Sequence, residues 1–395
     1  MSQSIFYLKN CMDKYIVLNN GIKVAINNHY DIVSRIIIAI MAGSRDCGNE
    51  LCGLAHFSEH ILLTDMHDKK DAIINCDGKT TNEETVISLT CLNDDFNRAL
   101  LLIRNCLSLE EIPYSSYEKE KEIIKSEIKR RSVFSNDFSN SINLQLFEGG
   151  LEYDTLGSDV LLDNITLEEI LNFRNKYYIS NNISISISTS LNVEYVTDMV
   201  STSLGRIKSG QEINRKPCQQ KSQYYITQRH KQDYVCNLYC YPIKIPFSLY
   251  SPLDLLLFFI GGKTSNNRLM EGLLMKGLKV YNAAMRIVKY SDFSVVFLEY
   301  DCPAGSVRAY EKAIKSIIES TILPYNEDQM DKLVKNYIIS YISYMNLDER
   351  LYMVCRDMLY NNSFFCQERD TLNYAKIVTA DCLKKAFIKY IKTFS

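Results

Sequence analysis

Strand-like and helix-like patterns of apolar residues succeed one another through the first half of the chain. Two short β-rich runs, residues 15–18 and 22–26, are separated by an Asn-Asn-Gly turn sequence, and an Asn-Gly pair favours a tight β-hairpin. Residues 32–41 form a longer apolar run, which predicts a buried strand. Helical periods of apolar residues follow, so this half is expected to combine helices and strands in one layered domain.

The second half repeats this pattern in outline. Residues 209–222 are polar and lack a periodic apolar face, and we interpret them as a linker. Beyond them, strands predicted at 234–241 and 294–300 bracket two helical stretches, and longer helices come after. The sequence therefore predicts an α+β fold of two similar α/β-layered domains, residues 1–208 and 223–395, of which the second is a degenerate copy of the first.

Composition narrows the classes of protein to which the chain can belong. Its 395 residues carry a formal net charge of −2 with both signs interspersed, which argues against binding to nucleic acid or to an anionic membrane. Thirteen cysteines without a CxxC pair argue against a disulfide framework and for reduced thiols. The N-terminus does not read as a signal peptide, and the apolar run 255–260 is too short to span a bilayer. We expect a cytoplasmic protein without a membrane segment.

The most informative stretch is residues 53–60, which contains two of the five histidines of the chain. On a helix, His56 and His60 lie one turn apart on the same face, so both imidazoles can bind one metal ion. Glu59 points into the same space, and the order His-x-x-Glu-His is the inverted zinc-protease motif. A chance arrangement on an ordinary helix is the alternative reading of these five residues.

A charged helix predicted at residues 117–131 offers further carboxylates. Glu120 and Glu127 are seven residues apart, which is two helical turns, and so share a face, whereas Glu118 and Glu122 point well away from Glu127. Taken alone, this helix reads as a solvated face with Glu–Lys pairs. Beside the histidine motif, two carboxylates on a partly apolar face indicate a third metal ligand and a supporting group.

Residues 42–45 (Ala-Gly-Ser-Arg), 53–60 and 120–127 resemble, in that order and spacing, the pitrilysin-type (M16) zinc peptidases. The resemblance covers nearly all of the first half and, more weakly, the second. It implies a half-length M16-type subunit with one Zn²⁺ per chain.

Matched position by position, the resemblance implies a role for each residue of the motifs. His56, His60 and Glu127 would bind zinc, and Glu59 would be the general base. Glu120 would orient one histidine ring. If Glu127 were not the third ligand, Glu120 or Glu122 would be the next candidates.

The resemblance also implies substrate-binding residues. Members of the family show Asn-Ala-x-Thr before the strand predicted here at 85–92, and that segment pairs with the peptide as an added β-strand. Asp77 and Gly78 occupy the Asn and Ala positions, and Thr80 matches. The departure puts the subsite preference in doubt, and a simple turn at Asp77-Gly78 is the alternative.

A partner subunit is expected for the same reason. Half-length members close as a dimer around a chamber, and their second domain offers an Arg and a Tyr, seven residues apart, to the substrate carbonyl. Tyr281 matches the Tyr, but the Arg position falls on Leu274, which cannot donate a hydrogen bond. We therefore expect a heterodimer with a second M16-like subunit that supplies the Arg and Tyr, with a homodimer as the alternative.

The leading hypothesis is a zinc-dependent endopeptidase that cleaves peptides inside a closed dimeric chamber. Removal of a leader peptide or maturation of a peptide in a bacterial pathway is a suitable setting. The rival is a non-catalytic M16-like structural subunit of a larger complex. Such subunits typically lose motif residues, whereas this chain keeps His56, Glu59 and His60.

Overall fold

In the computed structural model the chain forms two compact units. The structure describes residues 14–69, 74–108, 111–134, 139–231, 233–245, 247–248, 251–262, 267–324, 326–361 and 378–391. The first unit comprises residues 1–219 and 347–368, and the second comprises 220–346 and 369–395. The boundary after residue 219 lies inside the segment interpreted as a linker. Residues 347–368, however, belong to the first unit, and the sequence had assigned them to the second domain.

A six-stranded sheet forms the centre of the first unit, with the strand order β1-β2-β7-β3-β5-β4. All neighbours are antiparallel except the parallel pair β2 and β7. The strands are β1 (Lys14–Val17), β2 (Lys23–Asn28), β3 (Val33–Ile40), β4 (Asn75–Thr80), β5 (Thr85–Leu92) and β7 (Ile183–Thr189). The predicted hairpin is confirmed as β1 and β2, and β4 lies at an edge of the sheet.

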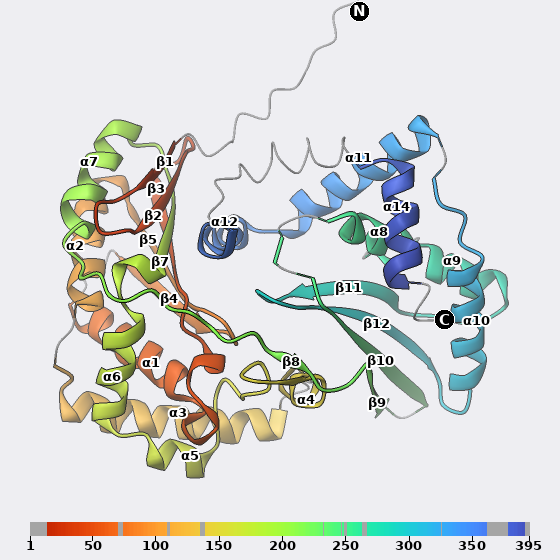
Figure 1. Ribbon diagram of the computed structural model, residues 1–395, viewed down its shortest axis with the longest axis horizontal. Helices are drawn as coiled ribbons and strands as arrows, with labels where there is room; N and C mark the ends of the chain where they lie inside the picture. The colour runs from red at the N-terminus through yellow and green to blue at the C-terminus, as the bar shows by residue number, and fades with distance from the viewer. Residues whose placement is uncertain are drawn as a thin grey trace, which may run out of the picture. The chain divides into compact units, whose positions relative to one another are not determined.

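Helices cover both faces of this sheet (Figure 1). One face packs against the larger group of helices in a core of aliphatic and aromatic residues. The helices of the unit are α1 (Leu54–Lys69), α2 (Phe96–Leu107), α3 (Tyr114–Phe134), α4 (Ser139–Leu146), α5 (Asp159–Asn164), α6 (Leu167–Tyr177), α7 (Val193–Leu204) and α12 (Leu347–Asn361). The short strands β6 (Phe147–Glu148) and β8 (Gln219–Gln220) pair with each other.

Helix α12 covers the other face of the sheet. Its buried side chains Leu351, Val354, Cys355 and Met358 recur at helical spacing and pack against small and branched residues of β2, β3 and β5. Lys23 on β2 also donates a 2.7 Å hydrogen bond to the carbonyl oxygen of Met358. Because β3 is covered on both faces, its residues 36–40 are all apolar, without the alternation of a half-exposed strand. The packing of α12 on this sheet explains why residues 347–361 belong to the first unit.

The second unit is built on a four-stranded antiparallel sheet in the order β11-β12-β10-β9. Its strands are β9 (Tyr225–Lys231), β10 (Tyr234–Ile243), β11 (Ala283–Lys289) and β12 (Ser294–Pro303). Its helices are α8 (Pro252–Gly261), α9 (Arg268–Met275), α10 (Val307–Glu319), α11 (Glu327–Tyr344) and α14 (Ala380–Ala386), which a π-helical turn (Phe387–Ile391) extends. The α+β class predicted for both halves is confirmed. Within the described ranges, none of the helices has the length and apolar character needed to cross a bilayer.

Candidate metal centre and active site

Helix α1 positions the histidine motif because most of its surface is buried. Gly53 leads into the helix with φ of 100°, a conformation that favours glycine. A Cβ at Gly53 would also lie 2.7 Å from the carbonyl oxygen of Leu156. Phe57 and Leu62 are fully buried in the core. With the helix fixed in this way, the remaining face presents His56 and His60 toward α3.

Helix α3 brings its carboxylates to the same place. Its buried residues Tyr117 and Ile124 face α1, and the Tyr117 ring stacks on Phe57 with centroids 5.3 Å apart. Residues at positions 117, 120, 124 and 127 share one helix face. Packing of the two apolar residues therefore turns Glu120 and Glu127 toward the histidines.

The side chains of His56, His60 and Glu127 converge. The Nε2 atom of His56 lies 3.7 Å from Oε2 of Glu127, and the Nε2 atom of His60 lies 3.6 Å from the same oxygen. The three potential ligand atoms all lie within 4.8 Å of one another. Two imidazole nitrogens and one carboxylate oxygen are a donor set that suits a catalytic zinc site, which keeps one position open.

Glu120 contacts His60 through the ring nitrogen that faces away from Glu127. Its Oε2 atom lies 2.9 Å from Nδ1 of His60, and Thr64 donates a 2.7 Å hydrogen bond to its Oε1 atom. An Nδ1–H that donates to this carboxylate leaves the Nε2 lone pair of His60 free for a metal. The structure thus places Glu120 where it can orient a histidine ring.

The surroundings of His56 disfavour the charged form of its ring. Burial lowers the pKa of His56 to about 3, and the charges of His60 and Arg131 lower it in the same direction. The ring is therefore neutral near neutral pH, which is the form that binds metal. Its buried Nδ1 atom has no hydrogen-bond partner among the described residues. These observations fit a zinc ligand on the Nε2 side.

Glu59 lies beside the ligands and is only 3% exposed. Burial raises the pKa of its carboxyl to about 7, against the opposing effect of a hydrogen bond from Thr80. That bond runs from Oγ1 of Thr80 to Oε2 of Glu59 over 2.7 Å. A Cβ at Gly78 would lie 2.8 Å from Oε1 of Glu59, so the glycine leaves space for the carboxylate. A buried carboxyl with a pKa near neutrality suits a general base.

The three residues predicted to bind substrate do not all lie on one element. Thr80 on the edge strand β4 points toward Glu59, whereas Asp77 lies on the opposite face of that strand by the alternation of side chains. The Asp77 carboxylate accepts a 2.9 Å hydrogen bond from the backbone N–H of Gly78. Tyr281 belongs to the second unit, where it is 72% exposed and packs edge-to-face against Tyr234. Substrate binding by Asp77, Thr80 and Tyr281 stays a prediction.

Hollows border the metal ligands on α1 and α3. One, of about 370 Å³, is lined by His60 and Glu120 together with Leu63, Thr64, His67 and Lys119. Another, of about 380 Å³, lies beside Glu127 and is lined by Glu122, Ile123, Ser126 and Arg130.

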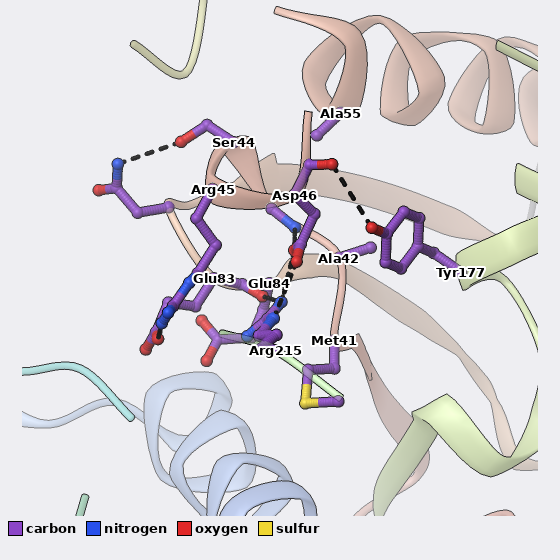
Figure 2. Close-up of polar contacts among 12 residues, drawn as sticks. Met41, Ala42, Ser44, Arg45, Asp46, Ala55, Glu83, Glu84, Tyr177 and Arg215 are labelled. Atoms are coloured by element: carbon purple, nitrogen blue, oxygen red, sulfur yellow. Dashed lines mark hydrogen bonds and ion pairs between the residues drawn. The ribbon is translucent and has the colours of Figure 1, made fainter. Parts of the chain in front are cut away.

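The Ala-Gly-Ser-Arg segment has a structural role that the sequence did not reveal. A Cβ at Gly43 would lie 2.4 Å from the carbonyl oxygen of Asn82, so the glycine permits close packing on the turn between β4 and β5. The Arg45 guanidinium forms a buried ion pair with Glu83 (Figure 2). Arg215, in the segment read as a linker, forms a 2.6 Å ion pair with Asp46. No periodic signal marks these residues, because each partner is distant in sequence.

Two family descriptions match the chain. The family described as "Insulinase (Peptidase family M16)" matches residues 23–161. The one described as "Peptidase M16 inactive domain" matches residues 164–337. The two matches follow each other along the chain and together include the histidine motif, Glu127 and Tyr281.

Individual relatives are distant. The chain is 25% identical over 218 residues to the mitochondrial-processing peptidase subunit beta of Dictyostelium discoideum, covering 50% of this chain and 45% of that subunit. The chain thus spans less than half the length of that subunit. It is 22% identical to an uncharacterized zinc protease of Rickettsia felis, covering 79% of each. A protease from Helicobacter pylori shares the fold, with a TM-score of 0.76, 16% identity and 96% of each chain covered.

Proposed function

Because the chain belongs to the M16 peptidase family, we propose that it is a zinc-dependent endopeptidase. The observation that carries this proposal is the convergence of His56, His60 and Glu127 next to a buried Glu59. In this assignment the two Nε2 atoms and the Glu127 carboxylate hold one Zn²⁺ per chain. When bound there, zinc supplies Lewis acidity toward the peptide carbonyl and lowers the pKa of a water molecule.

The residues of the chain perform the proton transfers of the proposed reaction. Glu59 takes a proton from the attacking water and delivers it to the leaving amine. Thr80 holds the Glu59 carboxylate in place through its hydrogen bond, and Glu120 holds the His60 ring. The peptide lies extended along β4, the edge strand of the sheet, and pairs with its main chain. On that edge Asp77 is available to the substrate.

Metal analysis and a cleavage assay test the proposal. The purified chain should contain about one Zn²⁺ and cleave a library of internally quenched peptides, and a chelator should abolish cleavage. His56→Ala, His60→Ala and Glu127→Ala should each remove the zinc. Stoichiometric zinc and full activity in Glu127→Ala would show that Glu127 is not a ligand.

A non-catalytic M16-like subunit is the second candidate, favoured by the match of residues 164–337 to the inactive domain of the family. Absence of cleavage by the zinc-loaded chain, with and without a partner, would support this role. A subunit of this kind has no need of Glu59, so the intact motif weighs against it.

The proposal includes a partner that closes the chamber. Leu274 is 58% exposed at the position where the family offers an Arg, and a leucine cannot stabilise an oxyanion. A second M16-like subunit would supply the Arg and Tyr, so the lone chain should cleave peptides feebly and the partner should restore the rate. Full activity from the chain alone would favour the homodimer with Tyr281.

We further propose that the protein works in the cytoplasm, removing leader peptides or maturing peptides in a bacterial pathway. Every cysteine that the structure describes is free, which suits a reducing compartment. Fractionation of the source cells, followed by detection of the chain, would test the location. Accumulation of an unprocessed peptide after deletion of the gene would identify the substrate.

A further inference from the structure

Two adjacent buried carboxylates occupy the turn between β4 and β5. Glu83 and Glu84 are each 1% exposed. Glu83 forms an ion pair with Arg45. Arg356 on α12 pairs with both carboxylates: its Nη2 atom lies 3.3 Å from Oε2 of Glu83, and its Nε atom lies 3.0 Å from Oε1 of Glu84. Buried carboxylates side by side are stable only when cations and hydrogen-bond donors compensate them. We call residues 81–84, together with the groups that bind them, the turn cluster.

The arginines of the turn cluster come from separate parts of the chain. Arg45 precedes α1, and Arg215, which donates to the carbonyl oxygen of Glu83, precedes the second unit in sequence. Arg356 lies on α12, where the chain has returned to the first unit. The hydroxyl groups of Tyr352 and Tyr360 on α12 also donate to Glu84. The turn is therefore bound by two stretches of the first unit that adjoin the second unit in sequence, the one that ends at residue 219 and the one that contains α12.

Backbone contacts make this turn rigid. The N–H of Ser44 donates to the carbonyl oxygen of Thr81, and that of Arg45 donates to the carbonyl oxygen of Asn82. Within the turn, the Thr81 hydroxyl accepts from the N–H groups of Glu83 and Glu84. A displacement of the carboxylates would therefore move the turn as a whole.

The turn directly follows the residues that shape the position of Glu59. Thr80, the last residue of β4, donates to the Glu59 carboxylate, and Gly78 borders its other oxygen. The path from Arg356 to the carboxylate of Glu59 thus consists of an ion pair, a rigid turn and one hydrogen bond. A misplacement of about 1 Å at a reacting group can cost roughly a hundredfold in rate.

We propose that Arg356 is a positioning residue: by binding Glu83 and Glu84 it fixes the turn that ends β4, and so places Thr80 and the carboxylate of Glu59. This inference rests on the proposed function of Glu59 as the general base. Buried ion pairs are weak contributors to stability compared with apolar replacements, which leaves geometry as the principal role of the cluster. In this way α12 supports the proposed active site, although it carries none of the proposed metal ligands.

The test compares variants of the full chain by amide hydrogen exchange of residues 75–84, by zinc content and by peptide cleavage. Arg356→Gln removes the ion pairs, and Tyr360→Phe removes one hydrogen bond to Glu84. Lys23→Met is the matched control, because Lys23 anchors the same helix through the carbonyl oxygen of Met358. Arg356→Lys keeps the charge but not the fork that spans two carboxylates.

Arg356→Gln should retain zinc, exchange the β4 amides faster than Lys23→Met does, and lower kcat roughly ten- to a hundredfold with little change in KM. Tyr360→Phe should shift the same quantities less, and Arg356→Lys should lie between Arg356→Gln and the wild type. If Arg356→Gln does not fold, Tyr360→Phe set against Lys23→Met decides the question.

Equal exchange of the β4 amides in the turn-cluster variants and in Lys23→Met would overturn the proposal. A loss of kcat that parallels the loss of folding stability to the same degree in the turn-cluster variants and in Lys23→Met would also overturn it. If the wild type cleaves no peptide, the proposed function fails, while the exchange of the β4 amides still reports whether Arg356 positions the strand.

Discussion

The two histidines of the candidate metal centre differ in how their rings are held. His60 has the Glu120 carboxylate at Nδ1, whereas Nδ1 of His56 is buried without a hydrogen-bond partner in the part of the chain that the structure describes. The His56 ring packs edge-to-face against the His60 ring, with centroids 4.6 Å apart, and a hydrogen bond to Glu120 holds His60. Because a carboxylate behind an imidazole also raises its basicity, Glu120 should contribute to metal affinity without binding the metal.

Replacement of Glu120 tests that contribution. Glu120→Ala should weaken zinc binding by about 10- to 100-fold, since the loss of such a partner frees the ring and its tautomer. Competition with a chromophoric chelator measures the affinity. Glu118→Ala, an exposed position on the same helix, is the control and should bind zinc as the wild type does. Unchanged affinity in Glu120→Ala would remove Glu120 from the metal centre.

The ionisation of Glu84 makes the contribution of the turn cluster to folding stability depend on pH. Burial alone would raise its pKa, but the charge of Arg356, with the Tyr360 hydrogen bond and Arg215, lowers it below the usual 4.5. A carboxyl with a lowered pKa in the folded state stabilises the fold above its unfolded pKa, and this contribution disappears as the pH falls through the folded value.

Glu84→Gln should therefore lower the free energy of unfolding by about 3 kcal/mol near neutral pH, because it removes one of the two buried carboxylates that pair with Arg356. The difference from the wild type should shrink as the pH falls below about 4.5. Urea denaturation at several pH values measures both quantities. A difference that stays constant or grows toward acid would show that Glu84 is not ionised in the fold.

At the scale of elements, helices cover both faces of the six-stranded sheet in the first unit. The apolar face of α1 and its neighbours packs on one side, and α12 alone packs on the other among the described helices. Helix α12 follows α11 in sequence but packs with the other unit. Its apolar stripe of Leu351, Val354, Cys355 and Met358 is thus as much a part of the first unit as the strands themselves.

Truncation of a side chain in that apolar stripe measures how much the stripe contributes to the free energy of unfolding. Leu351 is 1% exposed, so Leu351→Ala should lower the free energy of unfolding by about 2–4 kcal/mol through the cavity it leaves. Glu349→Ala, on the exposed side of the same helix, should change it by less than about 0.5 kcal/mol. Equal effects of the two substitutions would mean that α12 does not pack on the sheet.

For the whole molecule, local patterns in the sequence predicted much of the architecture. The Asn-Gly hairpin, the buried strand β3 and the helix with the His-x-x-Glu-His motif follow from short-range periodicity, and the structure shows all three. The spacing of Glu120 and Glu127 likewise placed both on one face of α3, because a helix fixes which residues share a face.

What the sequence did not predict depends on contacts between distant segments. Residues 347–361 were assigned to the second domain because sequence order is the default guide to domains, yet their apolar stripe fits the first sheet. Arg215 lies in a polar stretch that resembles a linker, and only the structure shows that it pairs with Asp46. No pattern in the sequence marks the adjacent acids Glu83 and Glu84 as buried, because the arginines that pair with them come from distant segments.

The central claim is that Glu59 performs the proton transfer of a peptidase beside a zinc site. Glu59→Gln keeps the shape of the side chain but cannot accept the proton, so one measurement of zinc content together with the rate of peptide cleavage tests the claim directly. The variant should retain about one Zn²⁺ per chain and lose turnover by roughly 10² to 10⁴-fold. A zinc-loaded Glu59→Gln protein that cleaves peptides at the wild-type rate would contradict the claim.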